Sequence, residues 1–206
     1  MWRWQKRTPM VRVYHEGHAQ EPPAPRTFGP LARFDPHVRD GRQRTREDPQ
    51  GRGVLYLAGE LGTALAESYP EQWPEVSICP HARAAWLSPP TAIPLLDLAG
   101  EGALAIGATG TLQWGDGPRR RTQRWARRIY EQYGALDGIR YRAAHQGGEC
   151  VVVWERAPRL RCSPGGDRRL WAVWSRVVVA LAGQRRAPRR IAATDCSRCR
   201  ELGLGG

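Results

Sequence analysis

Short apolar runs dominate the pattern of hydrophobic and polar positions along the chain. Val11–Tyr14, Val54–Ala58 and Leu95–Leu98 each have the length and composition of a strand that is buried or half-buried. Residues 139–142 and 150–154 form two further β-prone runs, and Gly147-Gly148 lies between them. This arrangement predicts two strands joined by a turn, in a sheet that also contains the earlier runs.

Three other segments have helical spacing. Residues 61–68 place apolar residues on one face and are followed by Pro70, which ends a helix. From Arg119 to Tyr133, apolar residues recur every four positions, arginines fill the opposite side, and Gly134 is a natural stop. Residues 169–182 repeat the pattern and predict a docked C-terminal helix.

The connecting segments are long and rich in proline, glycine and arginine. Residues 20–30, 39–53 and 70–93 are therefore expected to be irregular. Short strands alternating with unequal helices and long loops predict an α+β domain and not a doubly wound sheet. The chain has no G-x-G-x-x-G after a strand and no Walker loop, so a nucleotide would be bound by side chains.

A length of 206 residues with 41% hydrophobic content predicts one folded domain, which we place at residues 11–183. Residues 1–10 are expected to be a basic N-terminal tail and residues 184–206 a basic, mobile C-terminal tail. No run has the length of a membrane span, and the N-terminus lacks the apolar stretch of a signal peptide. A cytoplasmic location without membrane contact follows as an expectation.

The formal net charge is +12, and Lys6 is the only lysine among 32 basic residues. Guanidinium groups bind phosphates and carboxylates in a bidentate manner, so anionic partners are expected, although a GC-rich genome would also favour arginine.

The five cysteines are scattered and predict free thiols. Cys196 and Cys199 have metal-ligand spacing, but no second cysteine pair or histidine pair accompanies them, so no metal site is predicted. The five histidines show no ligand or triad spacing and are interpreted as loop residues.

A series of short motifs follows in a fixed order along residues 11–155. They are Val-Arg12-Val-Tyr, Ala-Arg33-Phe-Asp-Pro, Gly-Val-Leu-Tyr56-Leu-Ala, Thr-Ala-Leu-Ala-Glu67, Leu-Leu-Asp-Leu, Thr-Gln-Arg-Trp-Ala-Arg-Arg-Ile and Leu-Asp-Gly-Ile-Arg-Tyr. In this order they resemble the RES domain, the toxin component of bacterial toxin–antitoxin modules. The string from Arg33 to Glu67 is the most specific part.

The resemblance implies a compact fold related to ADP-ribosyltransferases and an enzyme that cleaves the nicotinamide–ribose bond of NAD with water or phosphate. Glu67 would be the catalytic carboxylate, because cleavage develops positive charge on the ribose. Arg12 and Arg33 would bind the pyrophosphate, and the ring of Tyr56 would stack on the nicotinamide. NAD is the substrate in this interpretation, no further cofactor is implied, and a cognate antitoxin protein is the expected partner.

Two positions depart from the family pattern. The serine expected before the helix at residue 119 is absent, and Thr122 is the nearest hydroxyl that would replace it. Some relatives have a tyrosine directly after the first arginine, whereas Val13 follows Arg12 and Tyr14 comes next. Taken singly, these residues also have ordinary roles, such as a solvated Glu67 or a core-packed Tyr56.

Two alternatives remain open at the level of sequence. The same fold would serve an ADP-ribosyltransferase that modifies a protein or another acceptor, since the loops decide the acceptor. The arginines of residues 119–128 and of the C-terminal segment would instead suit a nucleic-acid-binding module. No recognised DNA-binding motif accompanies them, so we expect nucleic acid to be bound only through the antitoxin.

Overall fold

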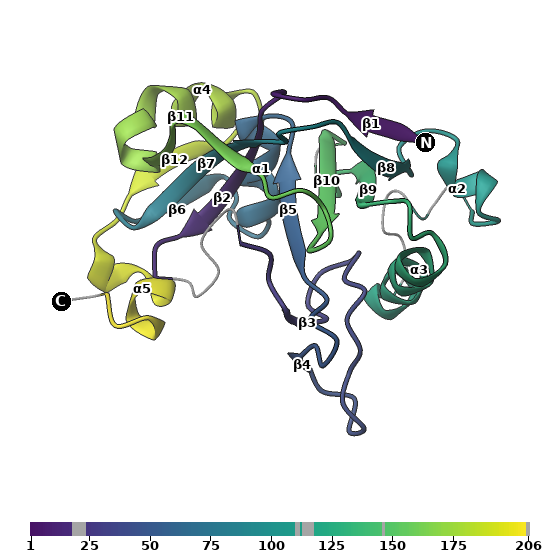
Figure 1. The fold of residues 1–206 in the computed structure, drawn as a ribbon. Coiled ribbons are helices and arrows are strands. Elements are labelled where there is room, and N and C mark those ends of the chain that lie inside the picture. The colour runs from purple at the N-terminus through teal and green to yellow at the C-terminus, as the bar shows by residue number, and fades with distance from the viewer. Residues whose placement is uncertain (18–23, 110–111, 113–117, 146, 205–206) are drawn as a thin grey trace.

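A curled eight-stranded sheet forms the centre of the molecule, as seen in the computed structural model (Figure 1), which describes residues 1–17, 24–109, 112, 118–145 and 147–204. In sheet order the strands are β1 (Trp2–Trp4), β8 (Ile93–Asp97), β9 (Gly138–Arg142), β10 (Glu149–Trp154), β5 (Val54–Ala58), β2 (Met10–His15), β7 (Ala82–Ser88) and β11 (Arg161–Arg169). Only β8 and β9 pair in parallel among these neighbours.

Two smaller pairings and several helices complete the fold. The pairings are β3 (Phe28–Gly29) with β4 (Arg46–Glu47), and β6 (Glu75–Ile78) with β12 (Ala187–Arg190). The helices are α1 (Leu61–Ser68), α2 (Gly102–Ala105), α3 (Arg119–Gln132), α4 (Trp174–Ala182) and α5 (Ser197–Glu201), with short 3-10 turns at Leu170–Val173 and Ala193–Asp195. The α+β class predicted from the sequence is confirmed.

The central strands are apolar on both faces because each face is covered. In β5, Leu55 and Leu57 belong to one buried cluster, whereas Val54, Tyr56 and Ala58 face the other. Successive side chains of a strand point to opposite faces, so a run without polar positions requires packing on both sides. The run of residues 54–58 follows this rule, and its predicted bounds are confirmed.

The other long predicted elements are also confirmed within a few residues. The helix expected from residue 119 runs from Arg119 to Gln132, and the pair of strands around Gly147-Gly148 is antiparallel, with Cys150 opposite Tyr141. The C-terminal helix docks through Leu170, Val177 and Leu181, which are buried.

Both predicted tails contain ordered elements. Trp4 is fully buried in β1, which pairs with β8, so the first residues are part of the sheet. β12 pairs in parallel with β6, and α5 follows it, so residues 187–201 are not an irregular tail. The prediction of an irregular tail was wrong here, because a short basic segment such as β12 can form a strand when the edge of another strand, here β6, is free to pair with it. Residues 205–206 of that expected tail lie outside the described residues.

The segment 70–93 was expected to be irregular and instead contains β6 and β7. Its prolines flank these strands: Pro74 and Pro80 bracket β6, and Pro89 follows β7. Proline outside a strand costs no ladder hydrogen bond. β11 was also missed, because a Pro-Gly-Gly sequence forms a register shift inside it. Among the described residues, no helix is both long and apolar enough to cross a membrane.

Candidate functional site

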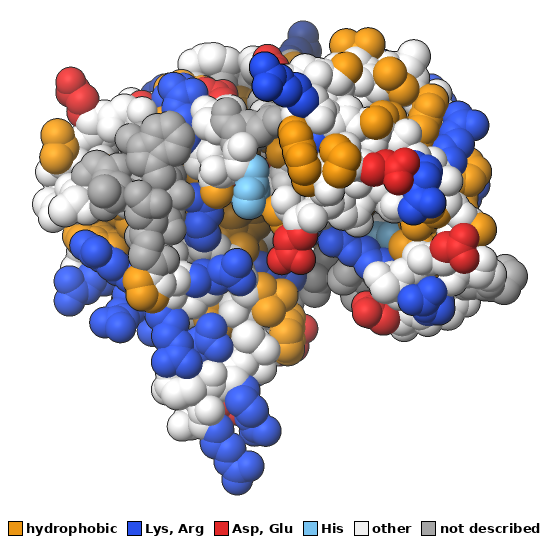
Figure 2. Space-filling view, turned by 180° about the vertical axis from the view of Figure 1, so that it is seen from behind, with side chains coloured by type: hydrophobic (Ala, Val, Ile, Leu, Met, Phe, Trp, Pro, Cys, Tyr) orange, Lys and Arg blue, Asp and Glu red, His pale blue; other side chains and the backbone are white. Residues whose placement is uncertain are grey.

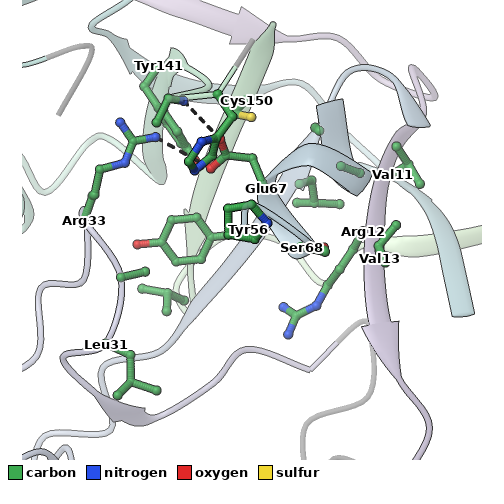
Figure 3. Close-up of a pocket in the computed structure, with 18 of the residues that line it drawn as sticks. Val11, Arg12, Val13, Leu31, Arg33, Tyr56, Glu67, Ser68, Tyr141 and Cys150 are labelled. Atoms are coloured by element: carbon green, nitrogen blue, oxygen red, sulfur yellow. Dashed lines mark hydrogen bonds and ion pairs between the residues drawn. The ribbon is translucent and has the colours of Figure 1, made fainter. Parts of the chain in front are cut away.

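A pocket of about 690 Å³ opens where β2, β5, α1 and the loop at residues 31–33 meet (Figure 3). The β9–β10 turn closes one side through Ala144 and His145. This volume lies within the range of small-molecule sites. Arg12, Arg33, Tyr56 and Glu67 all line it, so four residues far apart in the sequence share one cavity.

Glu67 lies near the end of α1, and its carboxylate is fixed by two contacts. Its Oε1 accepts a 3.0 Å hydrogen bond from the backbone N–H of Ala144, and its Oε2 lies 3.7 Å from Nη2 of Arg33. The side chain is 28% exposed, so it can be reached from the pocket. A half-buried carboxylate that accepts from a backbone N–H has a defined position and does not rotate freely in solvent.

Arg33 reaches Glu67 because aromatic rings support its side chain. The guanidinium carbon lies 5.1 Å from the centroid of the Tyr141 ring and 5.6 Å from that of Phe34. Cation–π contacts of this length hold a guanidinium group without neutralising it. Arg33 therefore retains hydrogen-bonding capacity toward an anion in the pocket.

Tyr56 has an aromatic ring in the pocket wall and a hydroxyl that is part of the scaffold. The hydroxyl donates a 2.7 Å hydrogen bond to Oδ1 of Asp35 and accepts one of 3.1 Å from the N–H of Phe34. Burial and the nearby Asp35 carboxylate raise the pKa of Tyr56, so the hydroxyl stays protonated. The ring remains the part of Tyr56 that a ligand can contact.

Asp35 was quoted within a sequence motif but was not identified as a site residue. It is fully buried, and its Oδ2 accepts hydrogen bonds from Nη2 of Arg26 at 2.6 Å and from the N–H groups of Leu31 at 2.6 Å and Ala32 at 3.0 Å. These bonds shape the loop that presents Arg33. The Asp35-Pro36 sequence, which begins two residues after Arg33, was the available signal, since Asp caps turns of this kind.

Arg12 lines the pocket from β2. Burial, together with the positive charge of Arg26, lowers its pKa to about 10. Because a guanidinium group stays protonated in proteins, this shift indicates a positive charge that is partly removed from water and gains no compensation from Arg26. An anion bound in the pocket would supply that compensation.

Thr122 does not line the pocket. It is buried in α3, and its hydroxyl donates to the carbonyl oxygen of Arg119 at 2.9 Å, within its own helix. Arg119 lines the pocket instead. Gly117, which lies just before α3 where the family's serine is expected, is outside the described residues.

Part of the arginine face of α3 supports the loop over the pocket. Arg119 donates to the carbonyl of Leu31 at 3.2 Å, and Arg127 donates to the carbonyl of His37 at 2.7 Å. Arg120 and Arg124 are exposed. Of the arginines on α3, Arg119 and Arg127 therefore hold the loop, whereas Arg120 and Arg124 lie on the solvated surface. Other basic side chains gather on the protrusion that carries β3 and β4 (Figure 2).

Charge in the pocket is unbalanced. Among the lining residues that the structure describes, arginine occurs five times and Glu67 is the one carboxylate. Two residues missed by sequence reasoning, His145 and Arg198, belong to this lining. Cys150 is also present, but burial and the Glu67 carboxylate raise its pKa to about 12, which keeps it a thiol. An anionic ligand next to a single carboxylate is the occupant that this arrangement fits.

Comparison with known proteins identifies the family. The family model described as "RES domain" matches residues 8–175, so the chain belongs to the RES-domain family. A chain in the crystal structure of the M. tuberculosis MbcT–MbcA toxin–antitoxin complex has the same fold, with a TM-score of 0.51 and 16% sequence identity. The match covers 84% of this chain and 88% of that one. No curated protein sequence matches the chain.

Proposed function

We propose that the chain is the toxin of a toxin–antitoxin module and that it degrades NAD by cleaving the nicotinamide–ribose bond. The observation that carries this proposal is the position of Glu67, a fixed and accessible carboxylate in a pocket that five arginines also line. Membership of the RES-domain family and a fold shared with a chain of a toxin–antitoxin complex support it.

The arginines suit the pyrophosphate of a dinucleotide. Arg12 is partly desolvated and lies close to the positive charge of Arg26, so a phosphate group would compensate both. Arg119 and Arg198 line the same pocket from two other elements. Arg33 is shared, because a bound phosphate would compete with Glu67 for its guanidinium group.

Glu67 suits the reaction centre. Loss of nicotinamide leaves positive charge on the ribose, and a nearby carboxylate stabilises this charge more in the transition state than in the ground state. The bond from the N–H of Ala144 fixes the carboxylate before the reaction, so little reorganisation is needed. Water or phosphate would then attack the anomeric carbon. Cys150 is not suited to act as the nucleophile, because it is held as a thiol.

Incubation of the purified protein with NAD labelled on its adenosine part tests the proposal. We expect label to appear as free ADP-ribose, or as its phosphate when phosphate is added, together with one nicotinamide per cleavage. Glu67→Gln should reduce the rate at least about 100-fold. Glu60→Gln is the matched control, since Glu60 is exposed at the start of the same helix.

The alternatives give different results in this assay. Label on a macromolecule, with little free ADP-ribose, would identify an ADP-ribosyltransferase. A wild-type protein that leaves NAD intact, or a Glu67→Gln variant as active as wild type, would contradict the proposal. In cells, expression of the chain alone should deplete NAD and stop growth, and co-expression with a cognate antitoxin should prevent both effects.

A further inference from the structure

Four metal-ligating side chains meet outside the pocket. His15 ends β2, Cys79 follows β6, and Cys196 and Cys199 flank the start of α5. Their ligand atoms all lie within 4.8 Å of one another. The sequence offered only the Cys196–Cys199 pair as a signal. The fold adds His15, which lies 181 positions before Cys196, and Cys79, which lies 64 positions after His15.

The ring of His15 is oriented as a ligand. Its Nδ1 lies 2.8 Å from the carbonyl oxygen of Glu16, which can only accept, so Nδ1 carries the hydrogen. Nε2 then presents its lone pair toward three sulfurs, at 3.2 Å from Cys79, 3.3 Å from Cys199 and 4.0 Å from Cys196. Donation from the second nitrogen to a backbone carbonyl is the usual orientation of a metal-bound histidine.

These separations fit a tetrahedral zinc ion. Zinc–nitrogen bonds of about 2.0 Å and zinc–sulfur bonds of about 2.3 Å place nitrogen and sulfur about 3.5 Å apart on the edge of a tetrahedron. The three observed distances lie on either side of this value. Backbone N–H groups of Arg198 and Cys199 also face the sulfur of Cys196, and that of His81 faces the sulfur of Cys79. Such donors stabilise thiolates.

A cluster of free thiols explains the arrangement less well. The single lone pair on Nε2 can accept only one S–H hydrogen, yet three sulfurs converge on it. His15, Cys79 and Cys199 are buried, so the other S–H groups would have to bond to neighbouring sulfurs, which are weak acceptors. The three cysteines are not joined by disulfides. We infer that His15, Cys79, Cys196 and Cys199 bind one structural zinc ion with a closed set of protein ligands.

This zinc ion would connect the C-terminal segment to the domain. It joins β2, the turn after β6 and the start of α5, three segments far apart in the sequence. Arg198 lies between the two last ligands, lines the candidate site and donates to the carbonyl of Ser68 at 3.5 Å. The ion would therefore hold one of the pocket arginines in place. Zinc binding itself does not depend on the proposed reaction.

Metal content tests the inference directly. The full chain is purified without chelators and with a non-thiol reductant, and zinc per chain is measured by elemental mass spectrometry. We expect about one zinc per chain in the wild type and in Cys162→Ser, since Cys162 is an exposed cysteine outside the cluster. Cys199→Ser and His15→Ala should lose most of it. Zinc at full occupancy in both ligand variants would refute the assignment of these residues.

Cobalt substitution in the wild type avoids dependence on variants that fail to fold. Replacing zinc with Co²⁺ should give the visible absorption of a tetrahedral thiolate site, with one cobalt bound per chain. Zinc should displace the cobalt and remove the absorption. A reduced, folded wild-type chain that carries no metal and takes up neither ion would overturn the inference, whether or not the chain degrades NAD.

Discussion

The hydroxyl of Tyr56 donates a 2.7 Å hydrogen bond to Asp35, and this bond joins strand β5 to the loop that presents Arg33. Asp35 also accepts from Arg26 and from the backbone N–H groups at the start of the loop. A ligand-facing ring and a buried carboxylate are thus parts of the same network. The candidate site depends on this scaffold as much as on the residues that would touch a substrate.

Removing the Tyr56 hydroxyl should therefore loosen the loop. We expect Tyr56→Phe to lower stability by about 1–3 kcal/mol, because a buried carboxylate loses a hydrogen-bond partner, and to raise KM for NAD while the ring is retained. Thermal unfolding and steady-state kinetics measure the two effects. Tyr133→Phe, at a residue that is 40% exposed, is the control and should leave both unchanged. A fully stable Tyr56→Phe protein would show that the bond does not support the loop.

Arg12 should contribute to binding at the expense of stability. Its charge is desolvated and faces Arg26, so Arg12→Gln should leave the melting temperature unchanged or raise it. The same change should weaken the binding of NAD or ADP-ribose roughly 10-fold or more, since a charge-assisted contact to phosphate is lost. Calorimetry and thermal unfolding test both parts. Arg3→Gln, on the exposed side of β1, should affect neither. A large loss of stability with unchanged affinity would contradict this role.

His37 should make the fold sensitive to mild acid. It is fully buried, and burial lowers its pKa below the usual 6.5; Arg26 acts in the same direction, whereas Asp35 and Asp48 oppose it. The unfolded chain therefore binds a proton more readily than the folded chain, so the free energy of unfolding should fall as the pH drops below about 6.5. Denaturant titrations from pH 7.5 to about 5 measure the slope. The slope should flatten in His37→Asn and persist in His145→Asn, at an exposed histidine; equal slopes in all three proteins would exclude His37 as the cause.

Local patterns were sufficient to predict the elements that lie near the site. The apolar run at residues 54–58 and the helical spacing at 61–68 predict β5 and α1, and the structure confirms both ranges. Long-range pairing was not predictable in the same way. β12 is a short, basic, proline-containing strand, and only the free edge of β6 makes it a strand.

In the candidate site, too, residues within local motifs were predictable, whereas residues that long-range contacts bring together were not. Glu67, Arg33 and Tyr56 were found through motifs, and they converge in the pocket. Thr122 was chosen by its position in the sequence, but its hydroxyl is bonded within α3. The partners of Cys196 and Cys199 could not be recognised, because they come from β2 and from the turn after β6. Arg198 was missed because its contact, the carbonyl of Ser68, lies at the end of α1. Spacing rules detect ligands that lie close together in sequence and miss those that the fold assembles.

Zinc removal should release the C-terminal segment and, with it, Arg198. Chelation, or the Cys199→Ser change, should increase hydrogen exchange and proteolysis in residues 191–204, because the metal joins this segment to β2. Exchange in β5 and β10, at the centre of the sheet, should change little. Arg198→Gln should raise KM for NAD in the zinc-loaded protein but have no added effect in Cys199→Ser, since the two changes act on one contact. Arg200→Gln, on the exposed side of the same helix, is the control. Unchanged exchange in residues 191–204 after complete zinc removal would show that packing, and not the metal, holds this segment.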